Sequence, residues 1–151
     1  MTGEWTLRFL LICLAITPAR RWLGLPWLAP YRRTFGLVAF GYGCLHLLTW
    51  LALEWFFDWN AIWEDIVERP FVTAGMAAFL CMVPLAATST RRAMRRLGRR
   101  WISLHRLAYV AAAFGVLHFL WLVKADLLAP GIHGAVLVGL LAARLGPPGR
   151  S

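Results

Sequence analysis

Charged residues are scarce in this sequence, and acidic residues are scarcer still. Only 15% of the 151 residues are charged, whereas 60% are hydrophobic and the mean hydropathy is +0.63. Such a composition leaves no room for an extended soluble catalytic domain and predicts a polytopic membrane protein. The 7 acidic residues against 16 Lys and Arg give a net charge of +9, but the charges fall in a few connecting segments. This clustering argues against a nucleic-acid-binding surface.

The sequence also lacks the motifs of several common site types. The three cysteines, Cys13, Cys44 and Cys81, lie inside apolar runs without CxxC or CxxCH spacing, so we expect neither a disulfide framework nor a covalent c-type haem. No GxGxxG, P-loop, HExxH or Ser/His/Asp pattern is present, so we expect no nicotinamide site. We also expect no cleavable signal peptide, because residues 1–4 lack basic residues and no small-residue cleavage site follows the first apolar run.

Apolar runs separated by short polar segments predict an all-α transmembrane bundle that forms one domain over residues 1–151. The first run is barely long enough to span a membrane. The segment that follows it, 18–33, contains prolines and arginines and is expected to be a broken interfacial loop. Pro84 predicts a kink near the end of the third run. We expect about five spans, at residues 5–17, about 35–55, 71–87, 101–124 and about 132–145.

The segments between these runs differ in charge. Ten arginines precede the second and fourth runs, at positions 20, 21, 32, 33, 91, 92, 95, 96, 99 and 100. The segment 57–70, after the second run, instead carries four acids and a single arginine, namely Asp58, Glu64, Asp65, Glu68 and Arg69. Short arginine-rich loops resist translocation across the membrane. We therefore predict that the arginine-rich loops are cytoplasmic and that the acidic segment lies outside.

Two histidines, His105 and His118, lie within the apolar run 101–124. An ionisable side chain is costly to bury at membrane depth, so such residues are candidates for ligands or relays. Thirteen residues of helix separate the two by about 20 Å, which puts one imidazole near each membrane face and suits ligation of b-type haem. A third histidine, His46, lies at a depth nearer to His118. We therefore predict that His46 and His118 ligate one haem toward the outer face, while His105 lies at the inner level with no histidine opposite.

These histidines also allow a structural interpretation. A membrane histidine can simply hydrogen-bond a neighbouring carbonyl. In an ideal helix His105 and His118 point roughly 140° apart. Either a local distortion such as a π-bulge near Gly115 brings them together, or they face different neighbours. We interpret His133, beside Pro130 and Gly131 at the start of the last run, as an interfacial histidine rather than a ligand.

Four stretches of the sequence together resemble one known family. They are RRTFGLVAFGYGCLHLLTW, ERPFVTAG, LAATSTRRAMRRLGRRWISLHRLAYVAAAFGVLHFLWLVK and a last run that ends in AAR. These stretches are similar to the MsrQ (YedZ) family, bacterial haem-binding membrane subunits within the ferric-reductase-like transmembrane group. The similarity covers nearly the whole chain. Members usually have six spans and this chain begins where the second would, so the resemblance predicts a missing upstream segment or a misassigned start.

The resemblance implies a subunit that relays electrons through the bacterial inner membrane, while a partner carries out the chemistry. The implied partner is the periplasmic molybdopterin enzyme MsrP, which repairs oxidised methionine. The three family histidines fall on His46, His105 and His118. We expect Arg32 near the propionates or the open face of an inner haem. The resemblance allows one or two haem b groups and an FMN, with a quinol or a cytosolic flavin reductase as the electron donor.

Two other functions stay open on the sequence. The chain fits a cytochrome b subunit that serves another acceptor, such as ferric chelates, and it fits a haem-free assembly or transport subunit whose histidines are structural. We predict that the acids of segment 57–70 dock the electron acceptor beside Trp59 and Trp63. The alternative for this segment is a solvated loop with interfacial tryptophans.

Overall fold

The computed structural model describes residues 2–123 and 127–145 of the chain. Every regular element within these residues is helical and none is a strand, which confirms the predicted all-α fold. Three helical segments are long and apolar enough to cross a membrane, namely Pro26–Glu54, Pro70–Ala87 and Arg99–Leu122. A shorter apolar helix covers Leu128–Arg144. The chain is therefore an α-helical transmembrane bundle.

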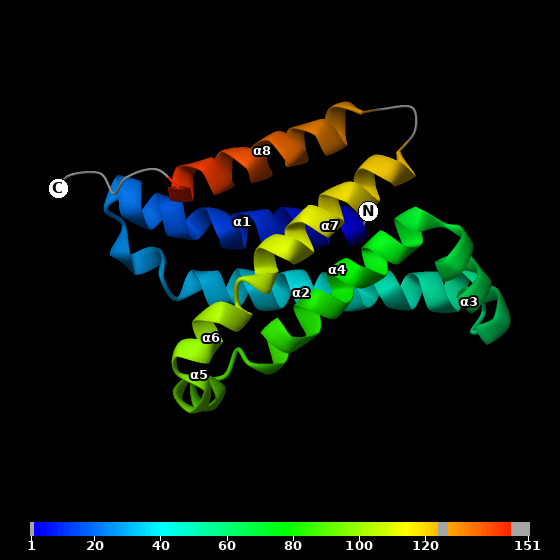
Figure 1. Cartoon of the computed structure of the whole chain (residues 1–151), viewed down its shortest axis with the longest axis horizontal. Helices are drawn as coiled ribbons and strands as arrows, with labels where there is room; N and C mark the ends of the chain where they lie inside the picture. Colours follow the sequence, from blue (N-terminus) through cyan, green and yellow to red (C-terminus); the bar gives the residue numbers. More distant parts are fainter. Residues whose placement is uncertain (1, 124–126, 146–151) are drawn as a thin grey trace.

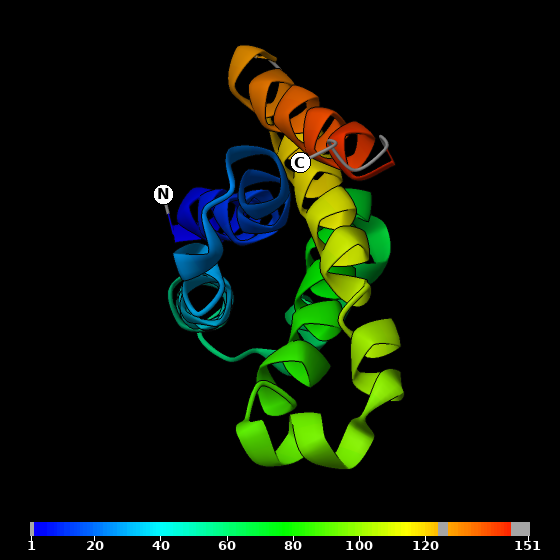
Figure 2. The ribbon, with the colours of Figure 1, turned by 90° about the vertical axis from the view of Figure 1, so that its left-hand side faces the viewer.

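The bundle is organised as two pairs of helices with a fifth helix at one edge (Figure 1). Helix α1 (Thr2–Leu23) packs along α2 (Tyr31–Thr49), and α4 (Pro70–Ala87) packs along α7 (Leu107–Leu122). Figure 2 shows the two pairs facing each other, with α8 (Leu128–Leu145) against α1 and α7. The space between the pairs is therefore bounded by helices from four parts of the chain.

Helix α1 supplies much of the apolar core. Its buried leucines, Leu7, Leu10, Leu11 and Leu14, recur at the three- and four-residue spacing of one helix face. They pack against residues from the four other helices, namely Ala39, Met82, Ala108, Ala111, Ala112, Val116 and Leu137. Many of these partners are alanines, and small side chains let membrane helices approach closely.

The break that the sequence predicts from residue 18 onward lies further along the chain. Helix α1 continues through Pro18, which is buried, and ends at Leu23. Gly24 then has a positive φ of 62°, as helix-terminating glycines do, and the short 3-10 helix η1 (Pro26–Leu28) leads into α2. Proline removes a single backbone hydrogen bond, and packing of α1 on its neighbours maintains the helix. The first helix is therefore longer than the predicted run.

The fourth apolar segment is also interrupted at an unpredicted place. It consists of α6 (Arg99–Leu104) and α7, which are joined by a turn at His105 and Arg106. Helix α7 is continuous through Gly115, so of the two alternatives the structure has no π-bulge there, and His105 and His118 face different neighbours. A π-helical turn instead extends α2, at η2 (Trp50–Glu54). Because the chain turns at His105, the ideal-helix angle between His105 and His118 no longer applies.

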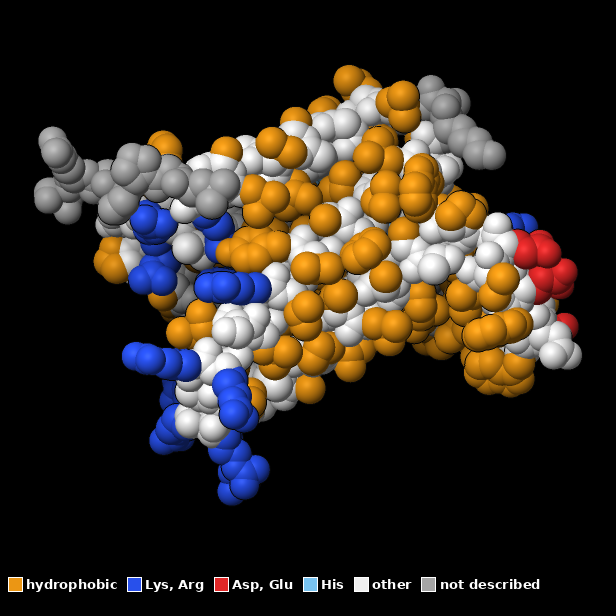
Figure 3. Space-filling view, viewed as in Figure 1, with side chains coloured by type: hydrophobic (Ala, Val, Ile, Leu, Met, Phe, Trp, Pro, Cys, Tyr) orange, Lys and Arg blue, Asp and Glu red, His pale blue; other side chains and the backbone are white. Residues whose placement is uncertain are grey.

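Charged residues gather at the two ends of the bundle, and the face between them is largely apolar (Figure 3). Arginines lie at the end that carries α5 (Arg91–Leu97) and α6, whereas acidic residues lie at the end that carries α3 (Trp59–Glu68). We name these the arginine end and the acidic end. Both charged segments form short helices rather than loops, and Asp58 caps α3 by accepting hydrogen bonds from backbone N–H groups of its first turn.

Candidate functional site

A cavity of about 430 Å³ lies between the two helix pairs. Its walls come from α1, α2, α4 and α7, and its acidic end is closed by residues of η2 and α3. This volume falls in the usual range of small-molecule and cofactor sites. The lining is mostly apolar, with Leu7, Leu10 and Met82 among the buried residues, and His46 and His118 project into it from opposite sides.

The structure brings His46 of α2 and His118 of α7 together, although 72 positions separate them in the sequence. Their ring centroids are 6.1 Å apart and the ring planes meet at 71°. Bonds from a metal to an imidazole nitrogen are about 2 Å long, so two imidazoles on opposite sides of one metal have ring centres roughly 6 Å apart. The separation of the two rings therefore suits a single iron between them.

The hydrogen bonds of the two histidines engage the same ring nitrogen, Nδ1. Nδ1 of His118 donates to the backbone carbonyl oxygen of Phe71, 2.6 Å away. Nδ1 of His46 lies 3.2 Å from the hydroxyl oxygen of Thr2. A ligating histidine commonly fixes its orientation in this way and leaves the other nitrogen, Nε2, for the metal. Both contacts involve Nδ1, so Nε2 is the ring nitrogen that would be the donor to a metal.

Two glycines make room for these imidazoles. A Cβ atom at Gly75 would lie 2.7 Å from Nδ1 of His118, and a Cβ atom at Gly3 would lie 2.9 Å from Nε2 of His46. Real Cβ atoms do not approach other atoms so closely, so a side chain at either position would displace a ring. Glycines are typical of close contacts between membrane helices, but which atoms these two glycines approach is visible only in the structure.

The other predicted site residues lie away from this cavity. His105 sits in the turn between α6 and α7, where its ring stacks on Trp101 with centroids 3.8 Å apart and its Nδ1 lies 3.1 Å from the carbonyl oxygen of the same tryptophan. Arg32 is within electrostatic range of His105. His133 hydrogen-bonds Ala129 within its own helix at 2.7 Å. The structure therefore keeps His105 and Arg32 near each other at the arginine end and separates them from the His46 and His118 pair.

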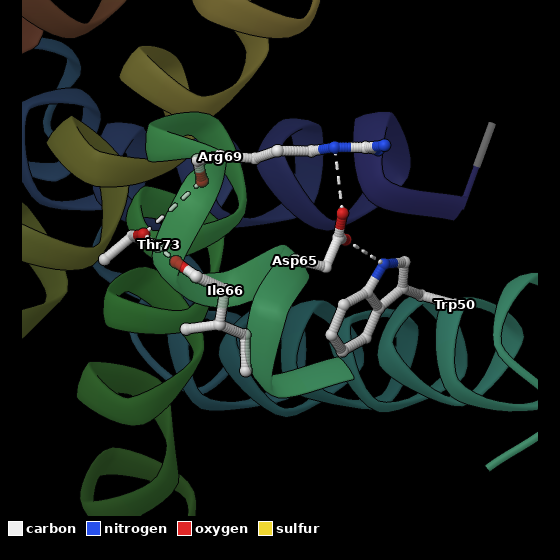
Figure 4. A network of polar contacts seen from close by, with 5 residues as sticks. All are labelled: Trp50, Asp65, Ile66, Arg69 and Thr73. Atoms are coloured by element: carbon white, nitrogen blue, oxygen red, sulfur yellow. Dashed lines mark hydrogen bonds and ion pairs between the residues drawn. The ribbon is translucent and has the colours of Figure 1, made fainter. Parts of the chain in front are cut away.

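An ion pair between a buried carboxylate and a half-exposed arginine at the acidic end was not anticipated by the sequence. Asp65 is only 4% exposed, and its carboxylate contacts Nε of Arg69 at 2.9 Å and Nε1 of Trp50 at 3.3 Å (Figure 4). The four-residue spacing of Asp65 and Arg69 on a helix is the signal that sequence reasoning missed. Two of the four acids predicted to form a docking surface thus have structural contacts. Asp65 is buried in the ion pair with Arg69, and the Asp58 carboxylate caps α3. Glu64 and Glu68 remain exposed.

Comparison with known proteins confirms the resemblance that the sequence predicts. The model of the ferric reductase like transmembrane component family matches residues 2–116. The chain is 58% identical over 146 residues to a protein-methionine-sulfoxide reductase heme-binding subunit MsrQ of Rhodospirillum rubrum, covering 96% of this chain and 70% of that protein. Proteins of the same name from Caulobacter vibrioides and Azospira oryzae are 52% and 53% identical, over 95% of this chain and 69% and 62% of theirs.

No solved structure is significantly similar to the chain. The sequence relationship is nevertheless decisive, because identities above 50% extend over almost the whole chain and cover the segments that carry His46, His105 and His118. The chain therefore belongs to the MsrQ family of ferric-reductase-like transmembrane proteins.

Proposed function

We propose that the chain is a b-type cytochrome subunit that carries electrons across the bacterial inner membrane to a periplasmic methionine sulfoxide reductase. The observation that carries this proposal is the pair of imidazoles, His46 and His118, whose ring centroids lie 6.1 Å apart in an apolar cavity. Relatives that are about half identical to the chain are named haem-binding subunits of such a reductase.

The residues around the cavity fit a haem. When bound, haem supplies an iron that accepts and releases one electron at a time. His46 and His118 would bind the iron through Nε2, while Phe71 and Thr2 would hold the two rings in position through Nδ1. The leucines of α1 and the alanine of α7 that line the cavity would exclude water from the bound group.

The charge distribution supports one orientation of the bundle. We infer that the arginine end is cytoplasmic and that the acidic end faces the periplasm, because arginine-rich loops resist translocation. The cavity reaches the acidic end, where Glu54, Asp65 and Arg69 line it. The haem held by His46 and His118 would then lie near the periplasmic surface, within reach of a soluble acceptor.

The acceptor that we propose is the molybdopterin enzyme MsrP. Reduction of a methionine sulfoxide to methionine and water consumes two electrons and two protons, so the subunit must deliver two electrons in succession. The electrons enter at the cytoplasmic side from a quinol or from a cytosolic flavin reductase. A second haem b, if the chain binds two, would be held at His105 with Arg32 beside it, and the arginine end would also receive an FMN phosphate.

A second acceptor is supported by a specific observation. The matching family model is described as a ferric reductase like transmembrane component. A chain with this fold could therefore reduce ferric chelates at the same outer surface. A haem-free assembly role is the remaining alternative, and it requires that the imidazoles of His46 and His118 be structural.

Stopped-flow spectroscopy separates these functions. Purified protein is loaded with haem, reduced with one equivalent of dithionite and mixed with purified MsrP or with ferric citrate. We expect rapid haem reoxidation by MsrP that is working on a methionine sulfoxide substrate, and slow reoxidation by ferric citrate. Faster reoxidation by ferric citrate than by MsrP would favour the ferric-chelate function. Protein that retains no haem after loading would favour the assembly role.

A further inference from the structure

A buried carboxylate organises two side chains at the acidic end of the cavity (Figure 4). Asp65 of α3 places Oδ1 at 2.9 Å from Nε of Arg69, and Oδ2 accepts a hydrogen bond from Nε1 of Trp50 at 3.3 Å. A carboxylate removed from water is costly unless it is paired and hydrogen-bonded, and both oxygens of Asp65 have a partner. All three residues line the cavity.

The backbone that carries Arg69 is fixed from both sides. Arg69 follows the last residue of α3 and precedes α4, with an extended φ of −108° and ψ of 101°. The next residue is Pro70, and a residue before proline is restricted to such extended values. Thr73 of α4 stabilises the junction between α3 and α4, because its hydroxyl donates a hydrogen bond to the carbonyl oxygen of Ile66 at 2.6 Å. The guanidinium is thus held at the cavity both by its backbone and by Asp65.

The ion pair uses only one of the N–H groups of Arg69. A guanidinium also presents a fork of two terminal nitrogens that matches a carboxylate. Within residues 2–123 and 127–145, these terminal nitrogens have no hydrogen-bond partner. Arg69 is also the only Lys or Arg among the described residues that line the cavity. The fork is therefore available to an anionic group of a molecule bound there.

We propose that Arg69 binds a propionate of the haem held by His46 and His118, and that Asp65 and Trp50 keep its guanidinium in place. The inference rests on the proposed haem binding. Haem carries two carboxylates at one edge, which need a cation when they leave water. Phe71, which holds His118, is two residues from Arg69, at most about 7 Å along an extended chain. One short segment therefore fixes both an iron ligand and the propionate-binding cation.

The Arg69 side chain is about half exposed, so solvent screens part of its charge, but a cation at the cavity wall still acts on the iron. The reduced haem is the more negative form, so a nearby cation favours it. Replacing Arg69 by Gln removes that cation and lowers the haem midpoint potential. Replacing Asp65 by Asn removes an anion of similar shape and raises the midpoint potential. Both shifts follow from the charges alone, so they test whether the pair lies beside the haem, and the haem affinity tests whether Arg69 binds a propionate.

The test uses full-length protein in lipid nanodiscs, with haem titration and a spectroelectrochemical titration of each variant. We expect R69Q to bind haem roughly tenfold or more weakly, since charge-assisted hydrogen bonds are lost, and to have a lowered potential. R69K keeps the charge but not the fork, so it should retain most of the potential and lose part of the affinity. D65N should have a raised potential. The control is R92Q, an exposed arginine of α5 at the opposite end, which should match the wild type in both measurements.

Several results would overturn the inference. One is an R69Q variant with native helix content by circular dichroism that keeps wild-type haem affinity and potential. Another is a shift of the potential in the same direction in R69Q and D65N. If R69Q does not fold, R69K and D65N are measured instead. Wild-type haem affinity in R69K, or a lowered potential in D65N, would then contradict the inference. Wild-type protein that binds haem but does not reduce MsrP contradicts the proposed electron transfer alone, whereas failure to bind haem contradicts both proposals.

Discussion

His118 and Phe71 are joined by a hydrogen bond in which Nδ1 of the imidazole donates to a backbone carbonyl oxygen at 2.6 Å. A carbonyl only accepts, so Nδ1 carries the proton and Nε2 keeps its lone pair. Gly75 lies one helical turn after Phe71, and the absence of a side chain there lets the ring of His118 approach α4. The backbone of α4 thus orients a residue of α7 toward the cavity.

Gly75→Ala tests this orientation. The added Cβ would lie 2.7 Å from Nδ1 of His118, so the ring must move away from Phe71 and from the position that we assign to the iron. We expect the haem content of purified protein to fall by roughly tenfold, because the hydrogen bond and the ligand geometry are lost together. Gly41→Ala is the matched control, since a Cβ at Gly41 meets nothing within 4 Å. Equal haem contents in the two variants would contradict the role assigned to Gly75.

His105→Ala tests whether a second haem binds. His105 is outside the cavity and stacks on Trp101, near Arg32. If His105 ligates a second haem, the substitution should lower the haem-to-protein ratio by about half and leave the shape of the remaining bands intact. The measurement is haem extraction with protein quantification. An unchanged ratio would assign His105 a structural role in the turn between α6 and α7.

The orientation of the bundle is tested with fusion reporters. A reporter placed after Leu97 should be cytoplasmic, because the arginines of α5 and α6 resist translocation. A reporter inserted at Asn60, in the first turn of α3, should be periplasmic. Paired alkaline phosphatase and green fluorescent protein fusions report the two compartments with opposite signals. The reverse pattern would invert the proposed direction of electron flow and remove MsrP as the acceptor.

Fewer acids of α3 are available to dock an electron acceptor than the sequence predicts. Asp65 and Asp58 have structural roles, so the exposed charges of α3 are Glu64 and Glu68. Replacing both with Gln should slow electron transfer to MsrP by roughly tenfold at low ionic strength and weaken its salt dependence, because electrostatic steering of the encounter is lost. Asn60→Ala, an uncharged change on the same helix, serves as the control. Transfer at the wild-type rate in the double variant would leave α3 without a docking role.

Periodicity and hydropathy predict most of the fold because helices in lipid must satisfy their own backbone hydrogen bonds. The long apolar runs are helices. Helix α4 begins one residue before its predicted start, at Pro70, whereas α2 begins four residues before its predicted start, at Tyr31. Pro18 was misleading, because burial against neighbouring helices outweighs one lost hydrogen bond. The turn at His105 has no comparable signal, since no proline or glycine precedes it closely.

The sequence predicts from depth that His46 and His118 lie close together, and ligation of haem by the two stays a prediction. Counting residues from the arginine borders placed His46 near His118, and the structure brings their rings to 6.1 Å. The contacts that hold the rings depend on residues distant in sequence, such as Thr2 and Phe71, and pattern analysis of one sequence does not reveal them. The burial of Asp65 was missed for the same reason, since the tryptophan that shields it belongs to η2.

The central claim is that His46 and His118 together ligate one haem iron. It is tested most directly by the dithionite-reduced minus oxidised absorption spectrum of purified wild-type protein beside His46→Ala, His118→Ala and His133→Ala. We predict reducible Soret and α bands in the wild type, loss of the same spectral component in both His46→Ala and His118→Ala, and no change in His133→Ala, whose imidazole bonds within its own helix. Full retention of the wild-type bands in either His46→Ala or His118→Ala would contradict the account.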